Sequence, residues 1–226
     1  MHTAHMSNSK TFSLVSALFV TTLIVSNIIA TKIGSFGGHY LPVAVIVFPV
    51  AYILGDILTE IYGYAAVRRV IWIGFLCNFI AVIAIGIAIN IPPAPFYQDN
   101  SAFIQVLGST PRILIASFIG YLAGAFSNAF IMAKMKLMTR GRFLWLRTIS
   151  STLIGEGLDS AIFITVAFSG VFAGADLIPL MLTQWIFKVL FEIIATPLTY
   201  LVVTTLKKRE GRDHFDYETN FNPLHF

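Results

Sequence analysis

Six long apolar segments alternate with short polar breaks along the chain. They cover residues 12–32, 41–63, 69–90, 111–133, 148–172 and 178–206. Each is about 20 residues long or longer, which is the length that an α-helix needs to cross the hydrocarbon core of a bilayer. The breaks are rich in glycine and proline, above all at Gly37-Gly38 and Pro92-Pro93. Because hydrocarbon offers the backbone no hydrogen-bond partners, we predict that every segment is a helix, the last two tilted or kinked.

The composition agrees with an all-α integral membrane protein of six transmembrane helices. Hydrophobic residues make up 57% of the chain and charged residues 12%, whereas about a quarter of a typical soluble domain is charged. The mean hydropathy is +0.80. We predict an N-terminal tail over residues 1–11, of which 1–5 resemble an added tag, a six-helix transmembrane domain over residues 12–206 and a polar cytoplasmic tail over residues 207–226. A short interfacial helix is expected over residues 101–107, in a loop on the outer face.

Basic residues indicate how the helices are oriented in the membrane. Of the 15 lysines and arginines, Lys32 and Arg112 fall on one side and Lys188 falls within a span. The other twelve fall on the opposite side: Lys10, Arg68, Arg69, Lys134, Lys136, Arg140, Arg142, Arg147, Lys207, Lys208, Arg209 and Arg212. By the positive-inside rule, this distribution predicts a multi-pass protein of the inner, cytoplasmic membrane with both termini in the cytoplasm. The net charge of +4 then reflects topology, and no nucleic-acid partner is expected, because the basic residues are spread over loops.

Two stretches about 100 residues apart resemble one another. Ser26-Asn27 corresponds to Ser127-Asn128, and the run ILGDIL at 53–58 corresponds to LIGEGL at 153–158. Chance is one explanation, because apolar helices match easily. The other is an internal repeat of three spans, whose two copies would have opposite orientations in the membrane, as they do in many secondary transporters.

Ionisable side chains inside the spans are the most informative feature, because each costs about 2.5–3.5 kcal/mol near the bilayer centre. They form three pairs, each on one helix face: Asp56 with Glu60, Glu156 with Asp159, and Lys188 with Glu192. Five acids and one base cannot all stay ionised and unpaired, so some must be protonated, paired, or neutralised by a bound cation or cationic substrate. This pattern is typical of a pathway for a solute or for protons.

Structural roles are the alternative at several polar positions. Glu60 lies close to the cytoplasmic end of its span and can extend toward Arg68 or Arg69 there. Asparagines within spans, such as Asn128, often join helices by hydrogen bonds instead of contacting a ligand.

Lys188 allows the sharpest structural prediction. It lies about ten residues from the outer end of its span, too deep for its ammonium to reach either surface. A structural pair with Glu192 on the same helix is one interpretation, but such a pair contributes only about 0.2–0.5 kcal/mol. We therefore expect an acid from another span, Asp56, Glu156 or Asp159, beside the ammonium.

Enzyme signatures are missing from the sequence. It has no histidine pair at metal-ligand spacing, no glycine-rich phosphate loop, and no serine or cysteine nucleophile near a base. We expect no catalytic residue, no metal and no cofactor. An intramembrane hydrolase built on paired carboxylates is the remaining enzyme class, and it would show chemical turnover of a substrate.

The polar positions also match a family pattern. The motif F-P-x-x-Y-x-x-x-D-x-x-T-E-x-Y-G occupies residues 48–63, S-T-x-x-G-x-x-x-D-S-x-x-F occupies 151–163, and F-K-V occupies 187–189. Further matching positions are Arg68, Arg69, Arg112, Ser117, Asn128 and Pro197. On these residues, the chain from about residue 12 to 206 resembles the vitamin-uptake transporters, also called queuosine-precursor transporters. The resemblance implies six spans, cytoplasmic termini and import of 7-deazaguanine precursors of a modified tRNA base.

A candidate substrate site follows from the intramembrane polar residues and their aromatic neighbours. We place it at mid-membrane, formed by Asp56, Asn128, Glu156, Asp159, Lys188 and Glu192, with Phe48, Tyr52 and Trp185 as stacking partners. A deazaguanine presents an N–H and an exocyclic amino group side by side, which one carboxylate can accept together. Its flat ring suits an aromatic neighbour, and a lysine can donate to its carbonyl group.

Two transport mechanisms remain open. The first is a stand-alone secondary transporter that imports the precursor. The second is a substrate-binding membrane subunit that needs an ATP-driven energising partner, since such subunits also have about six helices. Another vitamin-like heterocycle is the alternative substrate, and either mechanism is compatible with a homo-oligomer.

Overall fold

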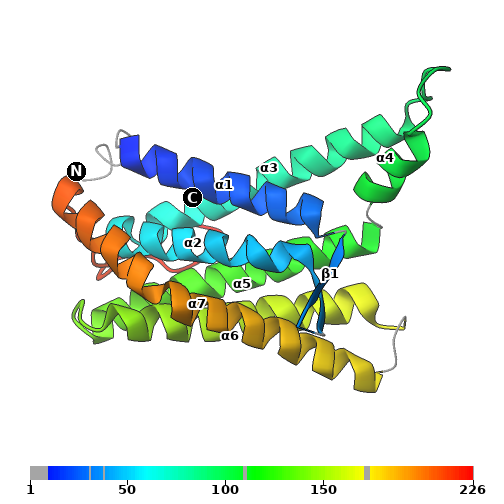
Figure 1. The fold of residues 1–226 in the computed structure, drawn as a ribbon. Helices are drawn as coiled ribbons and strands as arrows, with labels where there is room; N and C mark the ends of the chain where they lie inside the picture. The colour runs from blue at the N-terminus through cyan, green and yellow to red at the C-terminus, as the bar shows by residue number, and fades with distance from the viewer. Residues whose placement is uncertain (1–9, 31, 38, 109–110, 171–173, 226) are drawn as a thin grey trace.

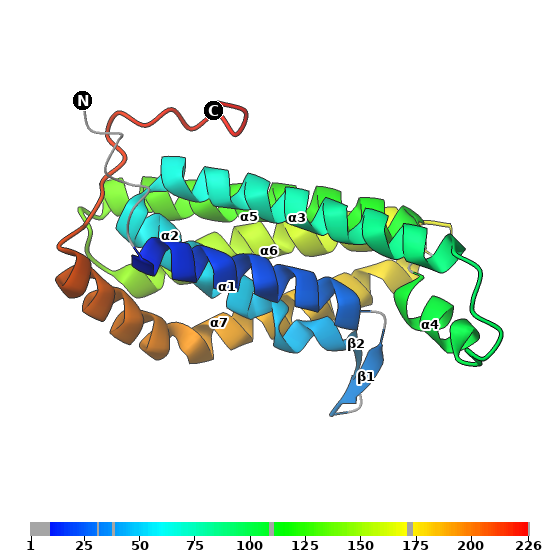
Figure 2. The same ribbon diagram turned by 90° about the horizontal axis from the view of Figure 1, so that it is seen from above.

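A computed structural model describes residues 10–30, 32–37, 39–108, 111–170 and 174–225. These residues form a bundle of α-helices with one 3-10 helix (η2) and one two-stranded hairpin. The elements are α1 (Lys10–Ile29), β1 (Ile33–Phe36), β2 (His39–Pro42), η2 (Val43–Ile46), α2 (Phe48–Tyr62), α3 (Tyr64–Asn90), α4 (Asn100–Leu107), α5 (Pro111–Met138), α6 (Leu144–Phe168) and α7 (Gly174–Glu210). The start of α1 and the C-terminal end of α7 lie at the same end of the bundle, which we call the terminal end (Figure 1, Figure 2).

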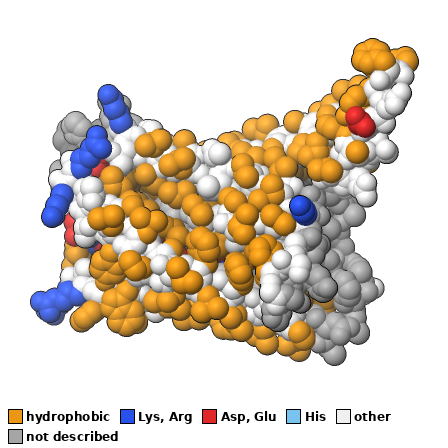
Figure 3. Space-filling model, in the orientation of Figure 1, with side chains coloured by type: hydrophobic (Ala, Val, Ile, Leu, Met, Phe, Trp, Pro, Cys, Tyr) orange, Lys and Arg blue, Asp and Glu red, His pale blue; other side chains and the backbone are white. Residues whose placement is uncertain are grey.

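Within the described residues, six helical segments are long and apolar enough to cross a membrane. They are Lys10–Ile29, Val43–Tyr62, Tyr64–Asn90, Ile115–Met138, Leu144–Ala167 and Leu177–Glu210. The prediction of an all-α multi-pass membrane protein is therefore confirmed, and α4 confirms the short helix expected between the third and fourth spans. Hydrophobic side chains cover most of the visible face, and most of its basic side chains gather toward the terminal end (Figure 3). The positive-inside rule associates such an end with the cytoplasm, and the orientation itself stays a prediction.

The helices differ from the predicted segments mainly at their ends. α3 begins directly after Gly63, whose φ of +83° ends α2 in a conformation that favours glycine. α5 and α6 reach further toward the terminal end than predicted, so Lys136 and Arg147 lie within helices instead of a loop. The glycine-rich break before α2 forms an antiparallel hairpin, in which Phe36 pairs with His39 next to the turn.

The last helix, α7, contains two prolines. Pro197 lies in its interior and has no backbone N–H to donate to the carbonyl of Ile193, one turn earlier. α7 curves around the outside of the bundle (Figure 2). This agrees with the prediction of a tilted or kinked last span.

Glycines allow α5 and α6 to approach closely. A Cβ atom added at Gly124 of α5 would lie 2.9 Å from the Gly155 carbonyl oxygen and 2.9 Å from Asp159 Cβ, both on α6. A Cβ at Gly155 would lie 2.8 Å from Asn128 Cβ on α5. Small residues at a four-residue spacing let membrane helices pack backbone to backbone. This contact brings the polar residues of α6 against those of α5.

A polar contact joins α1, α3 and α5 on the other side of the bundle. Asn27 Nδ2 donates to Asn78 Oδ1 at 2.6 Å, and Ser117 Oγ donates to Asn27 Oδ1 at 3.0 Å. Asn78 also donates to the Gly74 carbonyl. Asn27 and Asn78 therefore join helices, as intramembrane asparagines often do.

The residues after α7 fold back over the terminal end instead of extending as a free polar tail. Both carboxylate oxygens of Asp216 accept the Tyr64 backbone N–H at 3.1 Å, at the start of α3. Arg68 donates to the Asn220 and Asn222 carbonyls at 2.8 and 2.9 Å. The Phe221 ring packs on Tyr64, with ring centroids 5.0 Å apart. We call residues 211–225 the C-terminal strap.

We predict that Gly124→Ala destabilises the bundle, because the new methyl group would overlap the Gly155 carbonyl and Asp159. Overpacking of this kind costs about 1–3 kcal/mol, so the thermal unfolding temperature in detergent should fall. Gly86→Ala is the matched control, since a Cβ there meets no other described part of the chain within 4 Å. Equal unfolding temperatures for the two variants would contradict the close contact between α5 and α6.

Candidate functional site

Lys188 lies deep in the bundle, where two acids of the neighbouring helix bind it. Its ammonium is 2.6 Å from Glu156 Oε2 and 2.7 Å from Asp159 Oδ2, and the residue is 2% exposed. Glu156 and Asp159 lie three residues apart on α6, so both carboxylates project from the same face. The prediction that an acid from another span lies beside Lys188 is confirmed.

A second pair lies between α2 and α5. Asn128 Nδ2 donates to Asp56 Oδ1 at 2.6 Å, and both residues are buried. Glu192, on α7, is near enough to act electrostatically on Asp56 and on Glu156. The two pairs therefore belong to one group of side chains, Asp56, Asn128, Glu156, Asp159, Lys188 and Glu192, which we call the central cluster.

Glu192 differs from the other acids because it has no partner of its own. Within the described part of the chain, neither of its carboxylate oxygens has a hydrogen-bond partner, although the residue is 1% exposed. The structural pair of Lys188 with Glu192, one of the two sequence interpretations, therefore does not form. Lys188 pairs across helices instead.

Two of the three aromatic candidates border the central cluster. Lys188 Nζ lies 4.5 Å from the centroid of the Phe48 ring, a cation–π contact. The Tyr52 ring lies 5.6 Å from the Phe48 ring, and a Cβ at Gly124 would touch both the Tyr52 hydroxyl and Asp159. The third candidate, Trp185 of α7, instead contacts α6 through its indole N–H, which donates to the Leu153 carbonyl at 2.9 Å.

Several buried acceptors in and beside the central cluster lack a hydrogen-bond partner among the described residues. They are the Tyr52 hydroxyl, Asp56 Oδ2, Asn128 Oδ1, Glu156 Oε1 and both oxygens of Glu192, together with Thr152 Oγ1, Ser160 Oγ and Gln184 Oε1 close to them in the helices. A buried polar atom without a partner costs about 1–3 kcal/mol. This many buried oxygens without partners suit a polar solute that carries several hydrogen-bond donors.

Sequence reasoning missed Thr152, Ser160 and Gln184 as members of this group. The signal for them was a repeated spacing of four residues. Thr152, Glu156 and Ser160 share one face of α6, and Gln184 lies one turn before Lys188 on α7.

A cavity lies next to the central cluster, between α1, α2, α3 and α5. Its polar lining includes Tyr52 and Asn128, and the rest is mostly apolar, with Phe19, Leu23 and Ile71 among the lining residues. Asn128 links this space to Asp56. The cavity therefore borders the polar group on the side away from Lys188.

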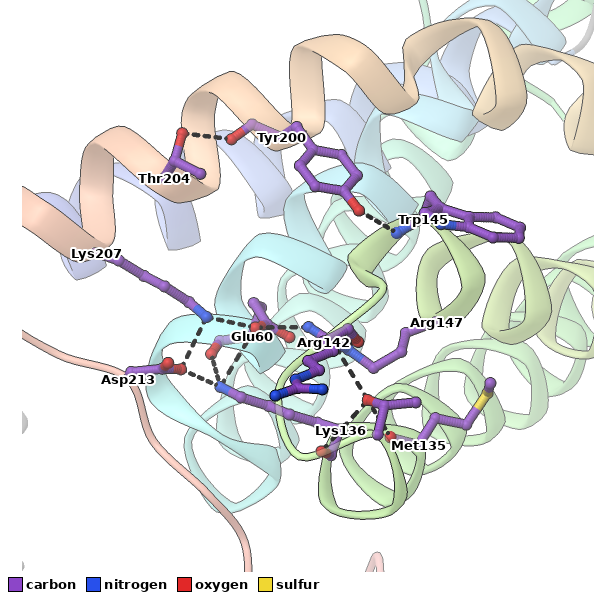
Figure 4. Close-up of polar contacts among 11 residues, drawn as sticks. Glu60, Met135, Lys136, Arg142, Trp145, Arg147, Tyr200, Thr204, Lys207 and Asp213 are labelled. Atoms are coloured by element: carbon purple, nitrogen blue, oxygen red, sulfur yellow. Dashed lines mark hydrogen bonds and ion pairs between the residues drawn. The ribbon is translucent and has the colours of Figure 1, made fainter.

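Glu60 forms a separate network nearer the terminal end (Figure 4). Its Oε1 atom lies 2.8 Å from Arg147 Nη2, 2.5 Å from Lys207 Nζ and 3.4 Å from Lys136 Nζ. Asp213 joins the same two lysines, at 2.5 Å from Lys136 and 2.8 Å from Lys207. We call these five residues the Glu60 network.

The Glu60 network corrects two expectations from the sequence. Glu60 pairs with Arg147 and the two lysines instead of extending to Arg68, which binds the strap. Because Lys136 and Arg147 are buried beside Glu60, the excess of acid is confined to the central cluster. That cluster contains four carboxylates and the single ammonium of Lys188, which contacts two of them.

A helical membrane bundle with ionisable residues buried in its interior has the architecture of a membrane transporter. Residues 42–202 match the family described as "Putative vitamin uptake transporter", and the chain belongs to this family. It is therefore a member of a transporter family and not an enzyme.

Two curated relatives carry more specific names. The chain is 24% identical over 146 residues to a protein of Bacillus subtilis (strain 168) named "Probable queuosine precursor transporter", and the match covers 64% of each chain. It is 25% identical over 166 residues to the "Queuosine precursor transporter" of Escherichia coli (strain K12), covering 72% of each chain. The match thus spans less than two thirds of the Bacillus protein. No solved structure matches this chain.

We predict that Lys188→Met lowers the free energy of unfolding by about 3–5 kcal/mol, because removal of one partner leaves buried charge uncompensated. Adding Glu156→Gln should recover part of this loss, since one of the two facing carboxylates is then neutral. Denaturant or thermal unfolding in detergent measures both variants. Lys32→Met is the control, because Lys32 is exposed; if Lys188→Met is as stable as that variant, the ammonium does not hold α6 and α7 together.

Proposed function

We propose that this chain imports a 7-deazaguanine-type queuosine precursor across the inner membrane and binds it at the central cluster. The observation that carries the proposal is the set of buried carboxylate and hydroxyl oxygens in and beside the central cluster that have no hydrogen-bond partner among the described residues. The names of the two relatives support the substrate class. The basic terminal end supports an orientation with both termini in the cytoplasm.

The chemistry of the central cluster suits a deazaguanine. The heterocycle offers an N–H and an exocyclic amino group as adjacent donors, and Glu192 offers two free carboxylate oxygens to accept them. A charge-assisted pair of this kind is stronger than a neutral one. Phe48 and Tyr52 supply flat surfaces beside the same space. The Lys188 ammonium has a third N–H to donate to the carbonyl of the heterocycle, beyond the two used for Glu156 and Asp159.

The excess of acid bears on substrate charge and on coupling. Four carboxylates and one ammonium carry a net negative charge when all are ionised. A precursor with an aminomethyl group is cationic and would offset part of that charge, and a proton bound at a carboxylate would do the same. We therefore favour secondary transport in which a proton or the positive charge of the substrate accompanies uptake.

Glu192→Gln tests the site without disturbing an ion pair. Because Glu192 is unpartnered, the variant should unfold at the same temperature as the native chain or higher. Its affinity for a 7-deazaguanine precursor should fall about 10- to 100-fold, which corresponds to a lost charge-assisted hydrogen bond of about 1.5–3 kcal/mol. Equilibrium binding and ligand-induced thermal shifts of the purified protein, over deazapurines, purines and vitamins, measure this.

Two further variants sharpen that measurement. Asp159→Asn should also lose binding, and Glu218→Gln, an exposed carboxylate of the strap, should bind as the native chain does. Undiminished affinity in both Glu192→Gln and Asp159→Asn would remove the central cluster from the substrate site.

Reconstitution separates the two transport mechanisms. We expect the purified chain alone to take up labelled precursor into liposomes, at a rate that changes when a proton gradient is imposed. The same liposomes with Glu192→Gln are the control. Uptake that appears only when an ATP-driven partner is added would instead favour a substrate-binding subunit of a larger importer.

A further inference from the structure

Polar side chains form a continuous track from the central cluster to the terminal end. On α2, Tyr52, Asp56 and Glu60 follow one another at a spacing of four residues and so share a helix face. All three are buried. Asp56 of the central cluster lies one helical turn from Glu60 of the Glu60 network. The two groups are therefore neighbours along the bundle.

On α6, the track continues between the same two groups. Thr148 and Ser151 are fully buried and lie between Arg147 and Glu156 in the helix. Polar and ionisable residues within a membrane span are costly, and they commonly mark a solute or ion path. The track thus runs from the proposed binding site toward the terminal end.

The Glu60 network closes this track by ion pairs that tie four helices together. Glu60 stands on α2, and its partners Lys136, Arg147 and Lys207 stand on α5, α6 and α7. The dashed contacts in Figure 4 converge on the Glu60 carboxylate from these separate elements. Separation of the helices at this end requires that these pairs break together. The Lys188 pairs in the central cluster, by contrast, join only α6 to α7.

The C-terminal strap reinforces the closure from outside. Asp213 bridges Lys136 and Lys207, and the His214 N–H donates to the Ile61 carbonyl at 3.4 Å, one residue beyond Glu60. Burial alone would raise the pKa of the Asp213 carboxyl, but hydrogen bonds from the two lysines outweigh it and hold the pKa below its usual value. Asp213 is therefore ionised at neutral pH. The glycine at position 63 admits His214, since a Cβ there would collide with the imidazole.

We propose that the Glu60 network is the gate at the terminal end of the solute path and that the C-terminal strap holds this gate closed. The inference rests on the proposed function for the identity of the solute that passes. The gate itself follows from the position of Glu60 at the junction of α2, α5, α6 and α7. Release of solute at this end requires undocking of Asp213 and separation of Glu60 from its cations.

A buried cysteine reports on the gate without any solute. Ser151→Cys places a thiol between the two groups, in a chain whose single native cysteine, Cys77, is replaced by serine. A small, charged, water-soluble thiol reagent is applied to the terminal end in vesicles of defined orientation. With the native gate we expect slow labelling, because Ser151 is fully buried.

Glu60→Gln should speed labelling by about tenfold or more, since loss of buried ion pairs shifts a closed–open equilibrium by such factors. Removal of residues 211–226, and Lys207→Gln at the partly exposed rim of the network, should each give a smaller increase. Glu218→Gln should leave the rate unchanged, because Glu218 forms no ion pair with any residue that the structure describes. Reagent applied to the opposite end should show no such increases.

The outcomes distinguish this inference from the proposed function. Unchanged labelling in Glu60→Gln overturns the gate; if that variant does not fold, unchanged labelling in both Lys207→Gln and the chain without residues 211–226 overturns it equally. Neither result depends on a substrate. Binding of the precursor at native affinity by the Lys207→Gln chain, together with faster labelling, supports a gate that is separate from the binding site. Loss of binding in Glu192→Gln with intact gating results would sustain both conclusions.

Discussion

A charge inside a bilayer has to be solvated by the protein itself, and the contact of Lys188 with Glu156 and Asp159 is where this structure meets that requirement. An ammonium at that depth without partners would cost several kcal/mol. Two carboxylates at 2.6 and 2.7 Å replace the missing water. They also hold α6 against α7, the helix that carries Glu192. The arrangement of the polar interior therefore depends on one lysine.

The two polar groups of the bundle solve the charge problem in different ways. The Glu60 network has three cations for two carboxylates, and each of its ion pairs lies between helices or between a helix and the strap. The central cluster has four carboxylates for one ammonium and leaves several acceptors unpartnered. A group whose buried charges are paired holds its helices in one arrangement. A group with buried acceptors that lack partners is stabilised most by a ligand that supplies donors. This contrast is our reason to assign closure to the first and binding to the second.

The sequence predicts the parts of this structure that depend on the bilayer. Six spans follow from segment length, and an interhelical acid beside Lys188 follows from the cost of a buried ammonium. The partners of Glu60 do not follow, because Arg68 and Arg147 are both within reach of its span end in a topology diagram. Only the packing of α6 against α2 selects Arg147. The strap escapes prediction for a related reason, because its contacts join residues far apart in the chain. The hairpin at β1 and β2 pairs residues that are close in the chain, but its glycine-rich composition reads as a loop.

The position of Asp159 shows how closely the proposed binding site depends on the fold around it. A Cβ at Gly120 of α5 would lie 2.9 Å from Asp159 Oδ1, and one at Gly124 would touch both Asp159 and the Tyr52 hydroxyl. The two glycines therefore leave room for the Asp159 carboxylate, which turns toward Lys188, and for the Tyr52 hydroxyl next to Asp159. Residues without any side chain thus set the geometry of the charged ones. A larger residue at either position would move a carboxylate that we propose as a ligand group and would also strain the helix pair, so we expect binding and stability to be coupled through the contact of α5 with α6.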